Sequence, residues 1–294
     1  MPVAAKQLYR YQDNQGRWHF SDRPPADNRP VETQRLTVTH ASRQVSMRQR
    51  GTEREPVFHV VNEYHGPIEI ELELLEGRNI SADPSLPRRM VVPGVSEARV
   101  VGLSPIQDGR GMSYRLQHRY MLGDPNAVHR PPEPYRVPFP PGFELPVSQG
   151  FNGSFSHNTP AGRYAVDIAM PEGTPIVAAR GGVVMEVAND FYGGGTQEQH
   201  KERANLIRVL HDDGTMAVYA HLSLESAQVS PGTRVQRGQL IGASGSTGFS
   251  SGPHLHFVIQ RNAGMELVSV PFNFADGEGR GFVPRRGDWL RAGR

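Results

Sequence analysis

The stretch that decides the fold class is NLIRVLHDDGTMAVYAHL, residues 205–222. Two apolar runs flank Asp213-Gly214, and an Asp-Gly pair between such runs is a strong signal for a two-residue β-hairpin turn. His211 precedes the turn and is expected to face solvent, whereas His221 closes the second run. The stretch therefore predicts antiparallel β-sheet with an imidazole at the end of one strand.

The composition of the whole chain favours the same fold class. Its 294 residues suffice for two or three domains, and they include 32 glycines and 25 prolines with only 37% hydrophobic residues. This mixture fits short strands joined by many turns better than long helices. The net charge of +2, without a basic block interleaved with aromatics, gives no case for a nucleic-acid partner. No apolar run reaches the roughly 18 residues that a membrane-spanning helix needs.

The chain contains no cysteine, which excludes disulfides, thiol catalysis and thiolate metal sites. Its first residues, MPVAAKQLYRY (1–11), lack the apolar core of a signal peptide. Two interpretations follow: either the protein is cytoplasmic, or the numbering begins after a signal peptide has been removed.

The N-terminal half is predicted to hold two modules and a linker. Aromatic-rich runs on both sides of Asn14-Gln15-Gly16 predict a β-hairpin module over residues 1–38. Residues 39–56 are charged and poor in large apolar side chains, which is typical of a linker. In the segment 57–137, IEIELELL (68–75) alternates aliphatic residues with glutamates. We expect a half-buried strand with one wet face there, within a small antiparallel β-sandwich.

A proline-rich segment, VHRPPEPYRVPFPPG (128–142), marks the next boundary, because its six prolines in fifteen residues favour an extended and stiff conformation. The block that follows, residues 138–294, is predicted to form one compact antiparallel sheet without a long helix. Its expected strands flank Gly181-Gly182, form the hairpin described above, and end with HLHFVIQ (254–260). The predicted fold class is thus mainly β throughout.

Five side chains in this last block form a candidate site. Residues two apart in a strand share one face, so His254 and His256 point the same way. His157 precedes Asp167 by ten residues, and Asp167 lies between two aliphatic residues of a predicted strand. A carboxylate there costs free energy unless it is paired or bound to a cation. Together with His221, these residues are typical of a zinc site with imidazole and carboxylate ligands.

Three motifs occur in order along the block: His157 followed by Asp167, YAHL (219–222) and GPHLHF (252–257). In this order they resemble the M23 peptidase family, the zinc endopeptidases of the lysostaphin/LytM type, over about residues 145–275. The resemblance implies a zinc-dependent endopeptidase that hydrolyses peptide cross-links in bacterial cell-wall peptidoglycan, with a D,D-cross-link as the expected bond. Some relatives have lost zinc ligands and activate other wall hydrolases, so a non-catalytic peptidoglycan-binding regulator is the alternative.

The resemblance also assigns roles to the five side chains. His157, Asp167 and His256 would bind Zn²⁺ as cofactor, and His221 and His254 would be catalytic residues that face the site without binding the metal. Two histidines and one carboxylate leave a coordination position for the water that zinc activates. Because the chain lacks H-E-x-x-H, one of the two catalytic histidines would be the general base. The sequence leaves open which one. The family usually spaces its first histidine and aspartate more closely than here.

The N-terminal stretch LYRYQDNQGRWHFSDRPP (8–25) resembles DUF4124, a small domain found after the signal peptide of proteobacterial envelope proteins. That resemblance implies a periplasmic or secreted protein with a removed signal peptide. The expected partners are peptidoglycan peptide stems and cross-links, without nucleic acid or a membrane span, and the oligomeric state is left open. A biotinyl or lipoyl carrier domain is disfavoured, because the only lysine beyond position 6 is Lys201, in a charged loop.

Overall fold

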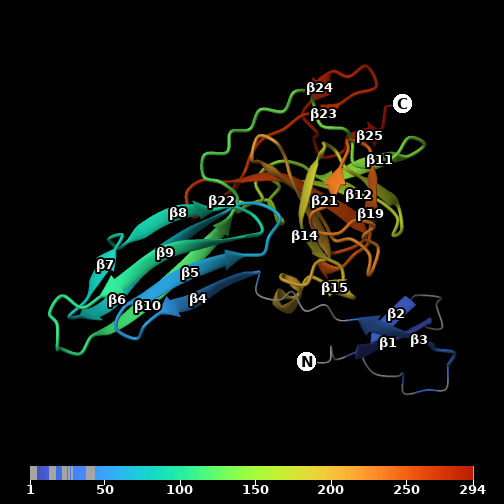
Figure 1. Ribbon diagram of the computed structural model, residues 1–294. Helices are drawn as coiled ribbons and strands as arrows, with labels where there is room; N and C mark the ends of the chain where they lie inside the picture. Colours follow the sequence, from blue (N-terminus) through green and yellow to red (C-terminus); the bar gives the residue numbers. More distant parts are fainter. Residues whose placement is uncertain are drawn as a thin grey trace.

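The computed structural model describes residues 5–12, 18–21, 25, 27, 29–37 and 44–293. Within these residues the chain is built almost entirely from strands, and the one helical element is a short 3-10 helix, Glu198–His200. Among them, no helix has the length and apolar character needed to cross a membrane. The predicted fold class, mainly antiparallel β, is confirmed (Figure 1).

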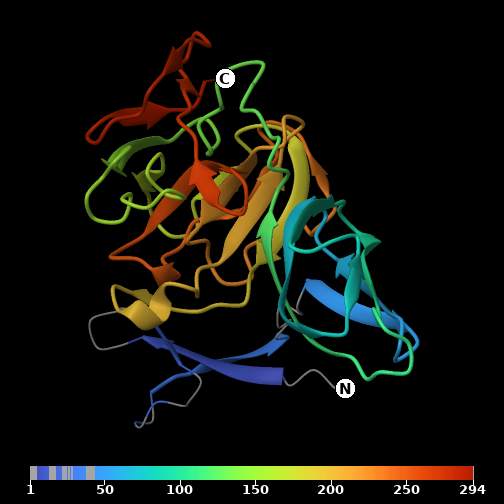
Figure 2. The ribbon, with the colours of Figure 1, turned by 90° about the vertical axis from the view of Figure 1, so that its left-hand side faces the viewer.

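The N-terminal residues form a small antiparallel sheet in the order β2-β1-β3, with β1 at Ala5–Gln12, β2 at Trp18–Ser21 and β3 at Glu32–Thr37. Strands β1 and β2 pair as a hairpin requires, while the expected turn at residues 14–16 lies outside the described residues. In Figures 1 and 2 this sheet lies below the C-terminal body, on the side of the 3-10 helix.

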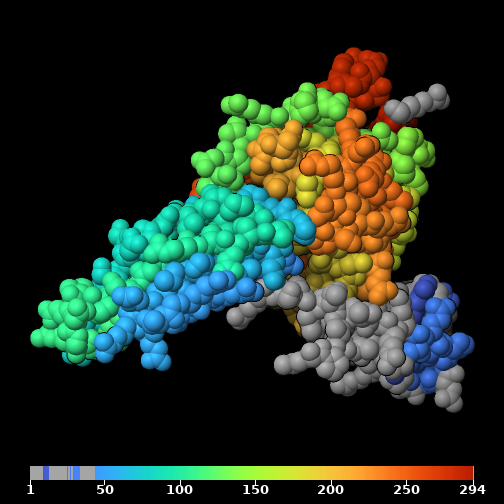
Figure 3. Space-filling model, in the orientation of Figure 1, coloured from blue at the N-terminus to red at the C-terminus, as the bar shows by residue number. Residues whose placement is uncertain are grey.

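The middle of the chain forms two antiparallel sheets, ordered β4-β5-β9-β7 and β10-β6-β8. They pack as the predicted sandwich and project from the C-terminal body as an elongated arm (Figure 3). Their strands are β4 (Val45–Gly51), β5 (Pro56–Asn62), β6 (Ile68–Arg78), β7 (Ser81–Asp83), β8 (Arg88–Val92), β9 (Ser96–Ser104) and β10 (Ser113–Leu122).

Strand β4 falls within residues 39–56, where we expect a linker. It pairs with β5 along its whole length, yet Val45 is the only buried residue of β4. Strand β4 lies at the edge of its sheet, which explains why this stretch contains few apolar residues. Strand β6 also differs from expectation, since Glu69 and Glu71 on its supposedly wet face are buried. Asn262 donates to Glu69 at 2.8 Å, and Glu71 pairs with arginines of β8 and β10. These partners satisfy the carboxylates.

The C-terminal block centres on a nine-stranded sheet in the order β18-β14-β16-β17-β21-β12-β11-β25, with β22 beside β21. The predicted hairpin is β16 and β17, and the predicted strands around Gly181-Gly182 are β13 and β14. HLHFVIQ begins β21 but is not the last strand, because four short strands follow it. The strands are β11 (Glu144–Gln149), β12 (Val166–Ala169), β13 (Pro175–Val177), β14 (Gly182–Ala188), β15 (Gly194–Gly195), β16 (Leu206–Leu210), β17 (Met216–Ala220), β18 (Arg234–Val235), β19 (Leu240–Ala243), β20 (Gly248–Phe249), β21 (His254–Asn262), β22 (Leu267–Ser269), β23 (Phe274–Ala275), β24 (Gly281–Phe282) and β25 (Trp289–Arg291).

Strand β21 separates the core from the candidate site. Leu255, Phe257 and Ile259 are fully buried in the main apolar cluster, while His254 and His256 alternate with them on the other face and are half-buried. Burial of each large apolar side chain contributes roughly 1.5–3 kcal/mol, so the core fixes the direction of both imidazoles.

Apolar contact also joins the sandwich to the C-terminal block. Met185 of β14 and Met216 of β17 are fully buried within the apolar cluster of the sandwich. The two parts therefore share packed side chains, and the predicted domain boundaries stay a prediction.

The proline-rich segment is anchored to the C-terminal block, but it is not extended throughout as expected, because it bends at residues 132–133 and 138–139 and turns at 141–142. Tyr135 is buried, its amide donates to Asn273, and its ring packs against His211 with 5.9 Å between centroids. His211 is therefore not solvated as expected. It is only 3% exposed, donates from Nδ1 to the Gly181 carbonyl at 2.8 Å, and burial lowers its pKa to about 4.

Candidate metal centre

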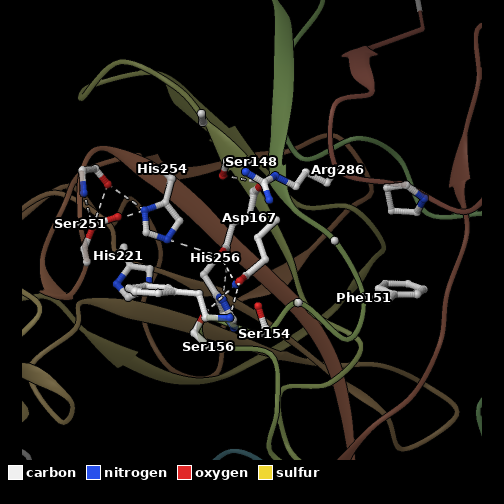
Figure 4. Close-up of a pocket in the computed structure, with 18 of the residues that line it drawn as sticks. Ser148, Phe151, Ser154, Ser156, Asp167, His221, Ser251, His254, His256 and Arg286 are labelled. Atoms are coloured by element: carbon white, nitrogen blue, oxygen red, sulfur yellow. Dashed lines mark hydrogen bonds and ion pairs between the residues drawn. The ribbon is translucent and has the colours of Figure 1, made fainter.

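Three neighbouring strands bring four of the five predicted site residues together (Figure 4). Asp167 of β12 lies directly opposite His256 of β21, and His254 lies two residues earlier on the same face of β21. On the other side of β21, His256 pairs with Ala220, so His221 follows at the end of β17. The pairing of β17, β21 and β12 therefore brings these side chains together at one end of the three strands.

His157 reaches the same place from a loop. The nine residues between it and Asp167 fold back on themselves, because the Arg163 amide donates to the Thr159 carbonyl at 2.9 Å and the Arg163 carbonyl accepts the Asn152 amide at 2.6 Å. His157 is only 1% exposed. The long spacing in the sequence is thus absorbed by a folded loop, and the imidazole still lies against Asp167.

The side chains of His157, Asp167 and His256 form a compact triad, in which one potential ligand atom of each lies within 4.8 Å of the others. The Asp167 Oδ1 atom is 3.2 Å from His157 Nε2 and 2.8 Å from His256 Nδ1. His157 Nδ1 donates to the Gly150 carbonyl at 2.8 Å, so a neutral His157 turns the lone pair of Nε2 toward the carboxylate. The Nε2 lone pair and the carboxylate oxygen are both hydrogen-bond acceptors, so they need a cation between them. Two imidazole nitrogens and one carboxylate oxygen are a set of ligands that zinc prefers.

Asp167 is ionised in this setting. Burial alone would raise the pKa of its carboxyl group, but the neighbouring imidazoles of His157 and His256, when protonated, outweigh burial and hold the pKa far below its ordinary value. Its second oxygen, Oδ2, accepts a hydrogen bond from Gln149 Nε2 at 3.0 Å. Because Gln149 occupies Oδ2, the carboxylate presents Oδ1 to both histidines.

His221 and His254 lie together beside the triad, with 4.5 Å between their ring centroids. Their Nδ1 atoms donate to the backbone carbonyls of Thr247 at 2.7 Å and Gly252 at 2.8 Å. Each neutral ring therefore carries its free lone pair on Nε2, and His254 Nε2 lies 3.8 Å from Asp167 Oδ1. Burial and the neighbouring imidazoles lower the pKa of His221 to about 3, and burial also lowers the pKa of His254. Both rings can accept a proton.

The backbone of His221 adds a further constraint. Its φ angle is 63°, in the left-handed region that residues other than glycine rarely adopt. Such conformations cost free energy and cluster at functional sites. Here the left-handed turn ends β17 and places the imidazole against the Thr247 carbonyl.

The five side chains surround one end of an open cleft of about 930 Å³, which Asp167, His221, His254 and His256 line directly. Loop 150–156 forms one wall and residues 249–253 form another. Phe155 and Phe249 stack with 5.9 Å between ring centroids, and Phe155 is largely exposed. The cleft is therefore accessible and partly aromatic.

Two glycine-rich stretches meet beside this cleft. The stretch GSTGFSSG (245–252) contributes residues 249–252 to the lining. The stretch FYGGG (191–195) supports that wall from behind, because Gly194 and Gly195 pair in parallel with β20. A Cβ atom on Gly194 would lie 1.9 Å from the Ser246 carbonyl oxygen, so only glycine allows this approach.

Sequence reasoning missed three polar residues near the triad: Gln149, Arg285 and Arg286. Gln149 is the last residue of β11 and pairs directly with Asp167 of β12, and the two arginines come from the C-terminal segment. Nothing in their local sequence indicates proximity to Asp167. Asn205 is fully buried and bonds to the backbone of Phe191, so its role is structural.

Two stretches of the chain match known protein families. Residues 161–267 match the model of Peptidase family M23, and residues 1–45 match a domain of unknown function, DUF4124. Both resemblances expected from the sequence are confirmed. His157 lies before the stretch that the M23 model covers, and the structure places it in the triad.

Curated relatives resemble part of the C-terminal block. The chain is 39% identical over 119 residues to glycyl-glycine endopeptidase ALE-1 of Staphylococcus capitis, covering 40% of this chain and 28% of that protein. It is 39% identical over 113 residues to lysostaphin of Staphylococcus simulans, covering 38% and 19%. It is 41% identical over 91 residues to peptidoglycan DD-endopeptidase ShyA of Vibrio cholerae, covering 31% and 18%. The chain thus spans less than a third of each relative's length, and the coarse activity that these relatives support is that of a cell-wall peptidase.

Proposed function

We propose that this chain is a zinc-dependent endopeptidase that hydrolyses D,D-cross-links of peptidoglycan, with His157, Asp167 and His256 as the zinc ligands. The observation that carries this proposal is the triad itself: two imidazole nitrogens and one carboxylate oxygen within 4.8 Å of one another beside an open cleft. The relative named as a peptidoglycan DD-endopeptidase supports the choice of bond. The cell wall, reached from the periplasm or the exterior, would be the place of action.

The triad is built to keep its geometry. Gly150 holds His157 through Nδ1, and Gln149 holds the outer oxygen of Asp167. Such outer partners fix the tautomer and the direction of each ligand. A zinc ion held there would polarise the scissile carbonyl and lower the pKa of a water molecule to about 7.

His254 and His221 would move the protons of the reaction. In the neutral state each ring has donated its only N–H to a backbone carbonyl, so Nε2 can accept a proton but has none to give. We assign the general base to His254, because its Nε2 atom lies closer to the triad, 3.8 Å from Asp167 Oδ1. The proton it takes from the attacking water can then pass from the imidazolium to the leaving amine. His221, whose ring lies beside it at a tilt of 42°, would orient this ring and the peptide.

The alternative, a non-catalytic regulator, predicts a ligand set with at least one position lost. Here all three triad positions and both neighbouring histidines are present, so no observation favours it.

The test combines metal analysis with digestion of purified peptidoglycan. The full chain should bind one zinc per molecule and release cross-linked muropeptide products, and His256→Ala should abolish both. His118→Ala, at an exposed histidine of β10, is the matched control and should change neither. Cross-link cleavage by His256→Ala at the rate of the unaltered chain would refute the proposal.

A further inference from the structure

The charged residues of the cleft are unevenly distributed. Apart from histidines, its lining contains one acid, Asp167, and two arginines, Arg285 and Arg286. The carboxylate of Asp167 is committed to His157 and His256. The positive charge of the two arginines is therefore left uncompensated inside the cleft.

A fixed turn holds both arginines in place. The Gly287 amide donates to the Val147 carbonyl at 2.9 Å, and Val147 donates back to Asp288 at 2.8 Å, which fastens the turn to β11. Asp288 also closes the turn, because its Oδ2 atom accepts the Arg285 amide at 2.7 Å. Gly287 has a φ of 93°, a conformation that glycine adopts without strain. The two guanidinium groups therefore start from a rigid base.

This turn packs against the support of the triad. A Cβ atom on Gly150 would lie 3.2 Å from the Arg286 amide nitrogen and 3.5 Å from the Arg285 Cα atom. The carbonyl of the same Gly150 accepts His157 Nδ1. In Figure 4 the side chain of Arg286 extends from the C-terminal segment in the direction of Ser148 and Asp167.

Neither guanidinium forms an ion pair with any residue in the described part of the chain. Other arginines of the C-terminal segment do: Arg280 pairs with Asp276 at 3.0 Å, and Arg291 pairs with Glu144 at 2.7 Å. A guanidinium group is planar and matches a carboxylate through two parallel N–H···O bonds. Two such groups left unpaired in a substrate cleft are suited to an anionic part of the substrate.

We propose that Arg285 and Arg286 form a subsite for a free carboxylate that the peptide substrate carries near the scissile bond. Under the proposed function, on which this inference rests, the enzyme discriminates between a stem peptide with a free carboxylate and the same peptide with that group amidated. The subsite lies outside the stretch that matches the peptidase family, so the C-terminal segment of this chain supplies the selectivity.

The test uses two synthetic cross-linked peptides that differ only in a carboxylate or a carboxamide beside the cleaved bond. The full chain should cut the acid with a kcat/KM about 10- to 100-fold above that of the amide, the range expected for a charge-assisted pair. Arg285→Gln combined with Arg286→Gln should remove this preference by lowering kcat/KM for the acid alone. Arg280→Gln, in the same segment but outside the cleft, is the control and should keep the preference. Equal cleavage of both peptides by the unaltered chain would overturn the proposal, as would an equal loss on both in the double variant.

Binding separates failure of this subsite from failure of the proposed function. If neither peptide is cut, calorimetric titration of the full chain still decides: the acid should bind more tightly than the amide, and the double variant should bind both alike. Equal affinities of the unaltered chain for the two peptides would refute the subsite whatever the activity. Arg285→Lys with Arg286→Lys should show an intermediate preference, because charge remains while the paired N–H geometry is lost.

Discussion

Replacement of Gln149 by leucine is expected to loosen the metal centre without unfolding the sheet. The Gln149 amide group bonds to three parts of the site: Nε2 donates to Asp167 Oδ2 at 3.0 Å and to Ser156 Oγ at 2.7 Å, and Oε1 accepts the Phe155 amide at 3.2 Å. One side chain thus links β11, the carboxylate ligand and the loop that carries His157. Leucine keeps the volume and removes all three bonds.

The expected magnitude follows from the bond to the charged carboxylate. Hydrogen bonds to ionised groups contribute about 1.5–3 kcal/mol, and 1.4 kcal/mol corresponds to a factor of ten in affinity. Loss of the outer partner of a metal ligand usually costs 10- to 100-fold in metal affinity, which agrees with that range. We therefore expect Gln149→Leu to weaken zinc binding by about 10- to 100-fold.

A competition titration with a zinc chelator on the full chain measures this affinity directly. Gln117→Leu, at an exposed glutamine of β10, is the matched control, and the thermal midpoint of both variants shows whether the fold survives. If Gln149→Leu folds and binds zinc within twofold of the unaltered chain, Gln149 does not hold the ligand, and the reasoning about Asp167 Oδ2 fails.

Further outcomes follow from other parts of the structure. Metal analysis of His221→Ala and of His254→Ala should show that each variant keeps stoichiometric zinc, while turnover falls by about 10²- to 10⁴-fold. Loss of zinc from either variant would show that the replaced histidine is a metal ligand. His211 has a folded pKa of about 4 against 6.5 unfolded, so its stabilising contribution is present above pH 6.5 and disappears as the pH falls to 4. The free energy of unfolding, measured in urea, should fall by about 3 kcal/mol over this pH window because of His211. The variant His211→Asn should flatten this pH profile. An unchanged slope in that variant would contradict the burial of His211 as a neutral ring. Gly194→Ala should lower the unfolding free energy by roughly 1–3 kcal/mol through its clash with a backbone carbonyl, whereas Gly252→Ala, which has open space, should change it by less than about 0.5 kcal/mol.

Local patterns in the sequence were sufficient for several of the strands and for part of the site. The hairpin at Asp213-Gly214 and the alternation of His254 and His256 depend on near neighbours in the chain, and the structure forms both. The loop has three residues instead of the predicted two, because the His211 amide donates to the Thr215 carbonyl and Asp212 joins the turn. Asp167 could be singled out because a carboxylate between aliphatic strand residues needs a partner. In each case the informative residues lie within one strand or one turn.

Features that depend on distant segments were not accessible in this way. Glu69 looks like a solvent-facing residue of an alternating strand, but Asn262, 193 residues away, makes its burial possible. The burial of His211 likewise depends on Tyr135 of the proline-rich segment, whose ring covers it. Arg286 reaches the cleft because a turn of the C-terminal segment is fastened to β11. No periodicity within a short window reports such pairings.

The most direct test of the account is the zinc content of His157→Ala. His157 lies before the stretch that matches the peptidase family and ten residues from Asp167, and the folded loop brings its imidazole to the carboxylate. The account predicts one zinc per molecule in the unaltered chain and loss of stoichiometric zinc in His157→Ala after equal dialysis. Retention of one zinc per molecule by that variant, with unchanged chelator competition, would contradict the proposed metal centre.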